Sequence, residues 1–308
     1  MTTSVYESPS CVGGYRTVGV LRVHGSDAAS FLNGMLTQKI TGRESDSVFA
    51  SARADAKGGV VGLFDVWAAD SDTFYVLCEG STASHWAETL DRFVFLEDVE
   101  MTDLDDWAVY TLQGAGVVDV LNQSEIVSPA EGRVVHHQSV HLLGRARCAA
   151  GGVDVLGART HLEVLKSELK GITDDPETLE RMRISAGHVR WPLDMAGRTL
   201  PHELGLRLTH LHFQKGCYVG QEIIHRLEVR GGIRRQVVVV ETSAPVKAGE
   251  DLLGAEKTEG KMLGQVPRDQ DGYLGLAQVR VEAAQVGALW MSKDGAEVRV
   301  VSCPHERL

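Results

Sequence analysis

The sequence predicts an α+β protein of two or three domains that ends in a small β-barrel or sandwich. At 308 residues the chain is too long for one small hydrophobic core. Patterns typical of strands and patterns typical of helices both occur before residue 236. After it, valine-rich segments are interrupted by glycine every few residues, as in short strands joined by tight turns.

The N-terminal part begins with a strand pattern and a short helix pattern. Residues 17–23 are rich in β-branched residues and predict a strand. Ser26 is a suitable N-cap, and the apolar residues after it predict a short helix. Residues 47–77 indicate strands broken by turns. A helix is expected at 82–93, because its apolar residues are spaced for burial on one face.

Further elements are expected before the valine-rich part. They are strands at 107–112, 133–140 and 146–149, and helices at 117–121, 159–169 and 176–185. A Gly-x-Gly sequence at 114–116 precedes the first of these helices. It lacks the third glycine of a dinucleotide-binding loop, so it predicts a turn and not a cofactor site.

Composition and charge exclude several classes of protein. The chain has 31 Lys and Arg residues and 42 Asp and Glu residues, which give a formal net charge of −11. An acidic chain repels nucleic-acid phosphates, so no direct nucleic-acid partner is expected. No segment approaches the roughly 20 apolar residues that span a bilayer, and residues 1–14 lack a signal-peptide pattern. A cytoplasmic protein without a membrane partner is therefore expected.

The cysteines and histidines show no standard metal-binding pattern. The five cysteines are far apart and include no Cys-x-x-Cys pair, so neither a zinc ribbon nor a disulfide framework is expected. His210, His212 and His225 lie near Cys217, but their spacing matches no zinc site. Packing or surface roles are favoured over metal binding for these histidines and for the group at 136–141, and no metal is expected.

Basic residues are concentrated in one segment. Residues 181–235 contain ten Lys and Arg residues and four Asp and Glu residues, so this segment carries about +6 and the remainder about −17. A basic segment in an acidic protein can direct an anionic ligand to one place. The alternative is that these cations form internal ion pairs with the acidic parts of the chain.

A glycine-flanked cysteine lies inside the basic segment. Cys217 stands between Gly216 and Gly220 in the sequence Lys-Gly-Cys-Tyr-Val-Gly-Gln-Glu at 215–222, which allows a tight turn. Lys215 and Arg226 are close in sequence, and nearby cations favour the reactive thiolate. Backbone N–H groups near Gln221 could face an anion. The alternative is a buried cysteine in a strained turn.

The sequence of this motif resembles the signature of the YgfZ family of folate-binding proteins. Their fold is similar to that of the aminomethyltransferase, or T-protein, of the glycine cleavage system. The resemblance extends over most of the chain. It includes the runs at 25–27, 31–34, 37–38, 55–58, 183–187 and 200–203, and the residues Arg226, Gly231, Arg234 and Arg235.

The resemblance implies a three-domain clover-leaf around a central hole. Two interleaved α+β domains and a C-terminal β-barrel are expected. The implied divisions are 1–45 with 105–150 for the first α+β domain, 46–104 for an inserted part, 151–235 for the second α+β domain, and 236–308 for the barrel. Tetrahydrofolate, or a one-carbon-substituted folate, would bind in the central hole. The basic segment would suit the carboxylates of its glutamate tail.

The resemblance also implies site residues. The expected functional thiol is Cys217, assisted by Lys215 and Arg226. The expected folate-binding residues are Asp55, Lys57, Gly58, Arg183, Glu203, Tyr218, Gln221 and Glu222.

Two departures bear on activity. The T-proteins carry an Asp-Asp pair where this chain has Gly62-Leu63, and Asp65 lies an odd number of residues after Gly62, which places it on the other face of a strand. The T-proteins also carry a pterin-binding glutamate where this chain has Ser185, and a hydroxyl cannot replace its charge-assisted bonds. The pterin would then depend on the backbone or on another carboxylate such as Glu203.

Two functions follow from the resemblance, and the sequence leaves open whether the chain is an enzyme. The first is a tetrahydrofolate-binding accessory protein in the assembly or repair of iron–sulfur enzymes, including those that modify tRNA, with iron–sulfur proteins or their assembly machinery as partners. The second is a folate-dependent aminomethyltransferase or methyltransferase. A scaffold that has lost folate binding is the remaining alternative.

Overall fold

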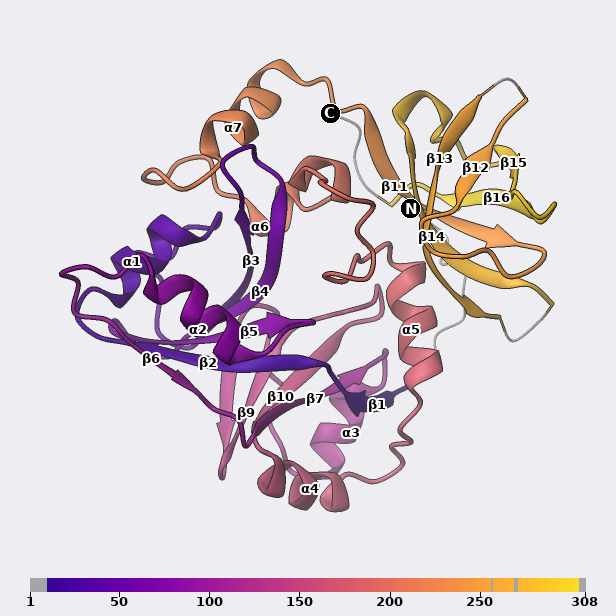
Figure 1. Ribbon diagram of the computed structural model, residues 1–308. Helices are drawn as coiled ribbons and strands as arrows, with labels where there is room; N and C mark the ends of the chain where they lie inside the picture. The colour runs from indigo at the N-terminus through magenta and orange to yellow at the C-terminus, as the bar shows by residue number, and fades with distance from the viewer. Residues whose placement is uncertain (1–9, 256, 269–270, 305–308) are drawn as a thin grey trace.

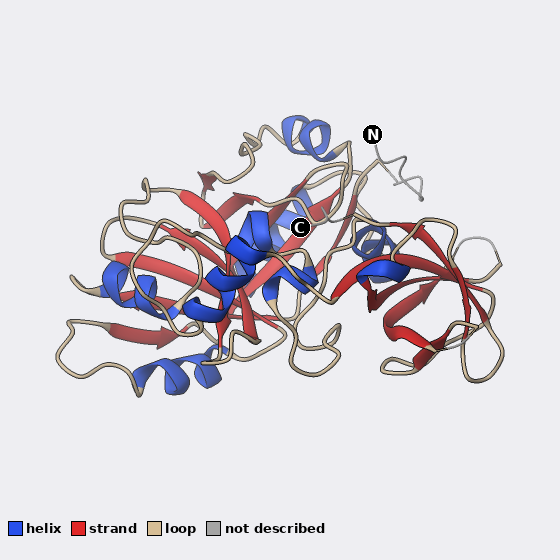
Figure 2. Cartoon of the chain, turned by 90° about the horizontal axis from the view of Figure 1, so that it is seen from above, coloured by secondary structure: helices blue, strands red, loops and turns tan. Residues whose placement is uncertain are grey.

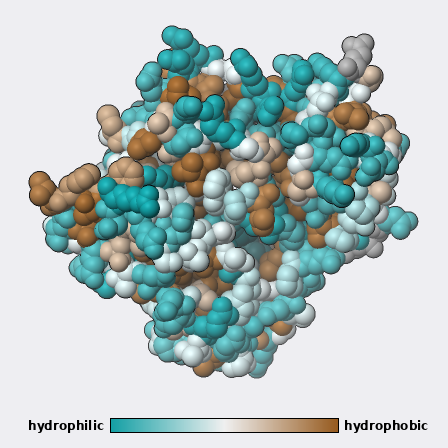
Figure 3. All heavy atoms as spheres, in the orientation of Figure 1, coloured by the Kyte–Doolittle hydropathy of each residue, from teal (hydrophilic) through white to brown (hydrophobic). Residues whose placement is uncertain are grey.

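The computed structural model describes residues 10–255, 257–268 and 271–304. The chain forms two five-stranded antiparallel sheets and a closed barrel, which appear as three lobes in Figure 1. Seen from above in Figure 2, the barrel lies to one side of the two sheets. Hydrophilic residues cover most of the face in Figure 3, and hydrophobic residues appear there in small groups.

The first sheet has the strand order β3-β4-β5-β2-β6. Its strands are β2 (Val18–His24), β3 (Ser47–Ala54), β4 (Val60–Ala68), β5 (Thr73–Glu79) and β6 (Glu100–Asp103). The helices α1 (Ala28–Met35) and α2 (Ala83–Asp91) pack on it. Their buried side chains, including Phe31, Leu32 and Trp86, share one core with the sheet, because each helix is apolar on one face only.

Two details of this lobe differ from the prediction. The residue at the N-cap of α1 is Asp27 and not Ser26, because the Ser26 hydroxyl donates to Asp98 at 2.9 Å. The helix predicted at 82–93 forms and begins after Thr82, whose hydroxyl accepts the backbone N–H of His85. It ends at Asp91, so Phe93 lies beyond its apolar face and is 38% exposed.

The second sheet has the strand order β1-β7-β10-β9-β8. Its strands are β1 (Val12–Tyr15), β7 (Trp107–Gln113), β8 (Val134–His137), β9 (Val140–Gly144) and β10 (Gly152–Ala158). The helices α3 (Val117–Gln123) and α4 (Arg159–Glu168) share its core. Since β1 pairs with β7 and the next strand joins the other sheet, the two α+β lobes are interleaved.

The sheets divide the chain at particular strands. The boundary expected at 45 falls between β2 and β3, which belong to the same sheet, and the boundary expected at 150 falls before β10. The change of sheet occurs instead between β1 and β2 and again between β6 and β7. The domain limits given above stay a prediction.

The strand predicted at 146–149 does not form. These residues are a loop between β9 and β10. Their alternating small and polar residues imitate a strand pattern. Buried carboxylates instead attract the side chains of Arg145 and Arg147, and the loop adopts the conformation that brings these two side chains to the carboxylates.

The C-terminal lobe is the predicted barrel, with the closed order β11-β14-β13-β12-β15-β16. Its strands are β11 (Arg235–Thr242), β12 (Asp251–Leu253), β13 (Thr258–Pro267), β14 (Tyr273–Arg280), β15 (Leu289–Met291) and β16 (Glu297–Ser302). The valine run of β11 is buried on both faces. Val238 and Val240 face the barrel core, whereas Val237 and Val239 join a core with Leu63 of β4.

The helices α5, α6 and α7 follow the second sheet in the chain and precede the barrel. The helix α5 (Pro176–Ser185) has the predicted bounds, and the carboxylate of Asp175 caps its N-terminus. The short helix α6 (Arg207–His210) and the helix α7 (Gln221–Arg230) follow. Figure 1 shows α5 between the second sheet and the barrel, and α7 beside the tip of the β3–β4 hairpin.

Candidate functional site

Many of the predicted site residues meet where the β3–β4 turn contacts the start of α7. The Asp55 carboxylate accepts the backbone N–H groups of Lys57 at 2.8 Å and Gly59 at 2.9 Å, which closes the turn. Gly220 has a φ of +83°, and a Cβ there would lie 2.4 Å from the carbonyl oxygen of Asp55. Only glycine therefore allows the cysteine motif to approach this turn.

Lys215 fixes the motif to the first lobe. Its ammonium donates to the backbone carbonyls of Asn33 at 2.6 Å, Leu36 at 2.6 Å and Gln38 at 2.8 Å. It also lies 4.9 Å from the ring centroid of the buried Tyr218. An ammonium has three N–H donors, so all of them are used by these carbonyls. The role visible in the structure is the anchoring of this loop.

The thiol of Cys217 is on the surface of the protein. It is exposed, and it lines neither of the two interior cavities described below. Arg226 lies on the exposed face of α7 and pairs with Glu222 at 3.3 Å. Among the described residues neither Lys215 nor Arg226 forms a hydrogen bond to the Cys217 sulfur, and the assistance expected from these two cations stays a prediction. Gln221, Glu222 and Arg226 line a shallow groove on α7.

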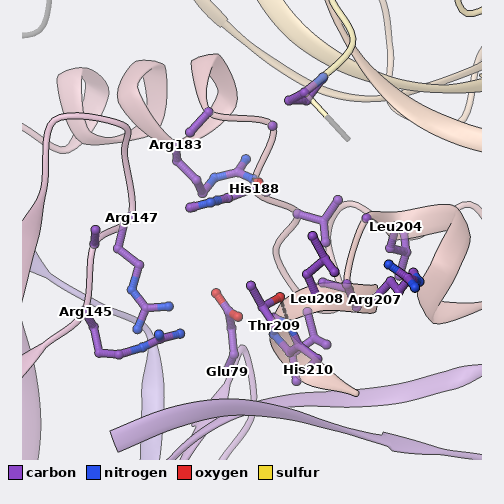
Figure 4. A pocket seen from close by; sticks show the side chains of 18 of the residues that line it. Glu79, Arg145, Arg147, Arg183, His188, Leu204, Arg207, Leu208, Thr209 and His210 are labelled. Carbon is purple, nitrogen blue, oxygen red and sulfur yellow. Dashed lines mark hydrogen bonds between the residues drawn. The ribbon is translucent and has the colours of Figure 1, made fainter. Parts of the chain in front are cut away.

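A first cavity of about 480 Å³ lies where the three lobes meet. Its wall includes Leu63, Glu79, Arg145, Arg147, Arg183 and Arg207. Figure 4 shows Glu79 at the end of β5, Arg145 and Arg147 on the β9–β10 loop, and Arg183 near the end of α5 around one open space. Burial lowers the pKa of His210, on the same wall, to about 3, so its imidazole is neutral at physiological pH.

A second cavity of about 490 Å³ adjoins the first. Glu79, Arg147 and Arg183 line both cavities, so these three side chains form a shared wall. The rest of the second cavity is more apolar and includes Tyr15, Leu179, Met182, Trp191 and Leu193. The two cavities therefore combine a charged junction with one apolar end.

Buried carboxylates position the arginines of the first cavity. Asp65 accepts from Arg145 at 2.9 Å and from Arg147, and Asp154 accepts from Arg147 at 2.6 Å. Burial opposes the ionisation of Asp65, but the charges of Arg147, Arg145 and Arg16 prevail and hold its pKa well below its usual range. Asp65 and Asp154 thus hold the guanidinium groups of Arg145 and Arg147 in place, and the remaining surface of these groups faces the cavity.

Glu79 is the carboxylate that points into the cavity. It ends β5, and the left-handed Gly80 after it turns the chain against the carbonyl of Trp191, where a Cβ would lie 2.0 Å away. Its side chain is 21% exposed, and its nearest cation is Arg16 at 3.8 Å. Within the described part of the chain, no donor makes a hydrogen bond to it. Burial raises its pKa, despite the opposing charges of Arg16 and Arg147.

Two further predicted site residues, Arg183 and Glu203, differ in their position relative to the cavities. Arg183 lines both cavities and is held by Glu180 at 2.7 Å and Asp194 at 2.7 Å. Glu203 lines neither cavity. Its carboxylate accepts the backbone N–H of Leu200 at 3.1 Å, and burial raises its pKa.

The strand β4 places its residues on two faces. Leu63 lines the first cavity, whereas a Cβ at Gly62 would meet the ring of Trp86 at 2.4 Å. Asp65 points to the same side as Leu63 and pairs with the arginines. The position that carries an aspartate pair in the T-proteins thus offers no carboxylate to the cavity in this chain.

The two interpretations of the basic segment, binding of an anionic ligand and internal ion pairing, each account for part of it. Arg181 pairs with Glu177, Arg190 with Glu180, and Arg207 with Glu228, so internal ion pairs are common. Arg183 and Arg207 nevertheless line the first cavity. These carboxylate partners lie on α5 and in the basic segment itself.

Sequence reasoning missed Glu79, Arg145 and Arg147. The available signals were weak: a glutamate-glycine pair at the end of a strand, and two arginines in an acidic part of the chain outside the basic segment. Nothing in the sequence indicates that these residues, far apart in the chain, line one cavity.

Two kinds of feature are absent from the described residues. Within residues 10–255, 257–268 and 271–304, no group of three or more His, Cys, Asp or Glu side chains is arranged to hold a metal ion. Among the same residues, no helix has both the length and the apolar character needed to cross a bilayer.

Comparisons with known proteins agree with the fold. Residues 13–156 match the GCVT N-terminal domain family. A chloroplastic protein of Arabidopsis thaliana, named as a putative transferase, is 24% identical over 87% of this chain, which spans 65% of that protein's length. Proteins named tRNA-modifying protein YgfZ, from Sodalis glossinidius and Escherichia coli O127:H6, are each 25% identical over 76% and 75% of this chain and 72% of their own length.

A solved structure has the same architecture. The aminomethyltransferase T of the glycine cleavage system from Bartonella henselae matches with a TM-score of 0.83 at 16% identity, covering 96% of this chain and 86% of that one. This likeness confirms the predicted aminomethyltransferase-like fold. Together with the match to the GCVT N-terminal domain it gives the chain a GCVT-like fold, and the sequence is similar to the YgfZ proteins over about three quarters of its length.

Proposed function

We propose that the first cavity binds tetrahydrofolate, or a one-carbon-substituted folate, and that the protein is a folate-dependent accessory factor for iron–sulfur enzymes. The observation that carries the proposal is the cavity itself, with its arginines and with the Glu79 carboxylate, to which no described residue donates a hydrogen bond. Its volume of about 480 Å³ is within the usual range for small-molecule sites.

The residues present suit the chemistry of a folate. Four arginines and two glutamates line the first cavity, which favours an anionic ligand such as the glutamate tail. Glu79 lacks a hydrogen-bond donor among the described residues, and the buried Nε of Arg147 lacks an acceptor there. Buried polar groups without partners are uncommon in proteins unless a ligand or water completes them. Tetrahydrofolate would supply a carrier for one-carbon units.

The transferase alternative has less support. Leu63 presents an apolar side chain to the cavity at the position where a T-protein has an aspartate. Proton transfer to or from a substrate needs an ionisable group within hydrogen-bond reach. Glu79 is the carboxylate that lines both cavities, so it is the first candidate for such a step.

The accessory role is proposed from the relatives and from Cys217. The YgfZ relatives are named tRNA-modifying proteins. The family resemblance of the cysteine motif implies that the route to tRNA modification runs through iron–sulfur enzymes. Cys217 is exposed on a glycine-flanked loop, so a partner protein can reach its thiol without entering the cavity. The cavity would then bind the folate, whereas the thiol would contact the partner protein.

The first test is calorimetric titration of the purified chain with tetrahydrofolate and with its polyglutamates, with an aminomethyl-transfer assay in parallel. Saturable binding that tightens with added glutamates, and no turnover, is the expected result. An absence of binding would overturn the folate proposal. Turnover would replace the accessory role with the transferase function.

The Cys217→Ala variant should separate the two parts of the proposed function, folate binding and the action on iron–sulfur enzymes. Because the thiol is exposed and lies outside both cavities, we expect a change in unfolding free energy within about 0.5 kcal/mol and unchanged tetrahydrofolate affinity. We expect loss of the ability to restore iron–sulfur-dependent tRNA modification in a strain lacking this protein. Modified nucleosides are measured by mass spectrometry. Full restoration by the variant would show that the thiol has no functional role.

A further inference from the structure

We propose that Glu79 recognises the pterin ring of the bound folate through the ring's N3–H and 2-amino donors. This inference rests on the proposed function, since it assigns one contact within the folate site. It assigns to Glu79 the specificity-determining role in pterin recognition for which the sequence suggested Glu203.

The first argument is the orientation of Glu79. The side chain leaves the end of β5 and points into the open space, between Arg147 on one side and Thr209 on the other (Figure 4). It borders both cavities, so a planar ring at their junction would contact it. Gly80 fixes this position, because its left-handed backbone lies against the carbonyl of Trp191.

The second argument is that Glu79 has no hydrogen-bond donor within the described residues. Its nearest cation, Arg16, is at 3.8 Å and is already held by Asp154 at 2.6 Å. The guanidinium groups of Arg147 and Arg183 border the same space, but each is bonded to other carboxylates. A carboxylate that is only 21% exposed and lacks donors is costly to keep unless a ligand supplies them.

The third argument is chemical complementarity. A carboxylate pairs best with two parallel N–H donors in one plane, and the N3–H and 2-amino groups of a pterin present that edge. Glu203 cannot provide this contact, because it lines neither cavity and accepts from the backbone of Leu200. Ser185, at the position of the T-protein glutamate, lacks a carboxylate.

The test is a titration of wild-type protein and of Glu79→Gln with tetrahydrofolate and with its 2-desamino analogue. The glutamine keeps the size of the side chain but offers only one acceptor oxygen beside a donor amide. We expect Glu79→Gln to weaken tetrahydrofolate binding by about tenfold to a hundredfold, as for loss of a hydrogen bond to a charged group. The exposed Glu88→Gln on α2 is the matched control and should bind like the wild type.

The analogue isolates the contact itself. Wild-type protein should bind the 2-desamino analogue more weakly than tetrahydrofolate, whereas Glu79→Gln should bind the two ligands with nearly equal affinity. Thermal unfolding of Glu79→Gln should occur at the same or a higher temperature, because a neutral amide is easier to bury than a carboxylate that accepts no hydrogen bond from the described residues. A general loss of structure would instead lower the temperature and preserve the difference between the ligands.

The outcomes separate this inference from the proposed function. If wild-type protein binds no folate, the proposed function fails and this assignment fails with it. If wild-type protein and Glu79→Gln bind tetrahydrofolate equally well, only the role of Glu79 is overturned. That role is also overturned if Glu79→Gln still discriminates between the two ligands, or if Glu203→Gln alone shows the loss of affinity.

Discussion

Replacing Asp65 by Asn should destabilise the protein by about 3–5 kcal/mol and greatly weaken tetrahydrofolate binding. Asp65 is 4% exposed and pairs with Arg145 and Arg147, and Arg16 lies 3.5 Å away. An amide removes the negative charge from a buried cluster and leaves the guanidinium groups under-compensated. The two cavity arginines would then leave their present positions. Urea unfolding and calorimetric titration measure the two effects.

The exposed Asp105→Asn provides the matched control, with an expected change within about 0.5 kcal/mol. Acid unfolding gives a second readout. Because the folded-state pKa of Asp65 is held below the ordinary value of 3.8, its contribution is fully present above that value and is lost as the pH falls below it. The variant should lose less stability than the wild type over this acidic range. A parallel loss in both proteins would show that Asp65 does not carry the effect.

Replacing Lys215 by Met should cost about 2–4 kcal/mol of unfolding free energy. The ammonium donates to three backbone carbonyls at the end of α1, and no methionine atom can replace those donors. The apolar part of the side chain is retained, so the loss reports the hydrogen bonds and not the packing. Denaturant unfolding followed by circular dichroism measures the change.

Lys57→Met on the β3–β4 turn is the comparison for Lys215→Met. Lys57 is exposed, and its backbone N–H makes the contact to Asp55, so its side chain should contribute less than about 0.5 kcal/mol. Equal effects of the two substitutions would contradict the anchoring role of Lys215. Both residues are part of the sequence resemblance, and the structure assigns them different importance.

Local sequence signals were sufficient for many elements. The bounds of α5 follow from Asp175 as a cap and Pro176 at the first helical position, and both are visible in the sequence. The valine run of β11 predicted a strand, although not that both of its faces would be buried. The strand prediction at 146–149 was wrong because the carboxylates that shape this loop, Asp65 and Asp154, belong to other strands.

The candidate site was predictable only in part, for a related reason. The motif at 215–222 was recognisable, but the partners of Lys215 are backbone carbonyls, which side-chain patterns do not reveal. Glu79 has an ordinary sequence neighbourhood, and its importance comes from where β5 ends relative to α5 and the β9–β10 loop. Such convergence depends on tertiary topology, which periodicity and composition do not specify.

The connection between β1 and β2 limits how the protein can change shape. Only Arg16 and Thr17 separate these strands, which belong to different sheets. Arg16 also reaches a carboxylate of each sheet, Asp65 on β4 at 3.5 Å and Asp154 on β10 at 2.6 Å. The two α+β lobes are thus joined at one point, both by the short connection between β1 and β2 and by the ion pairs of Arg16. This double connection resists separation of the two α+β lobes at that point.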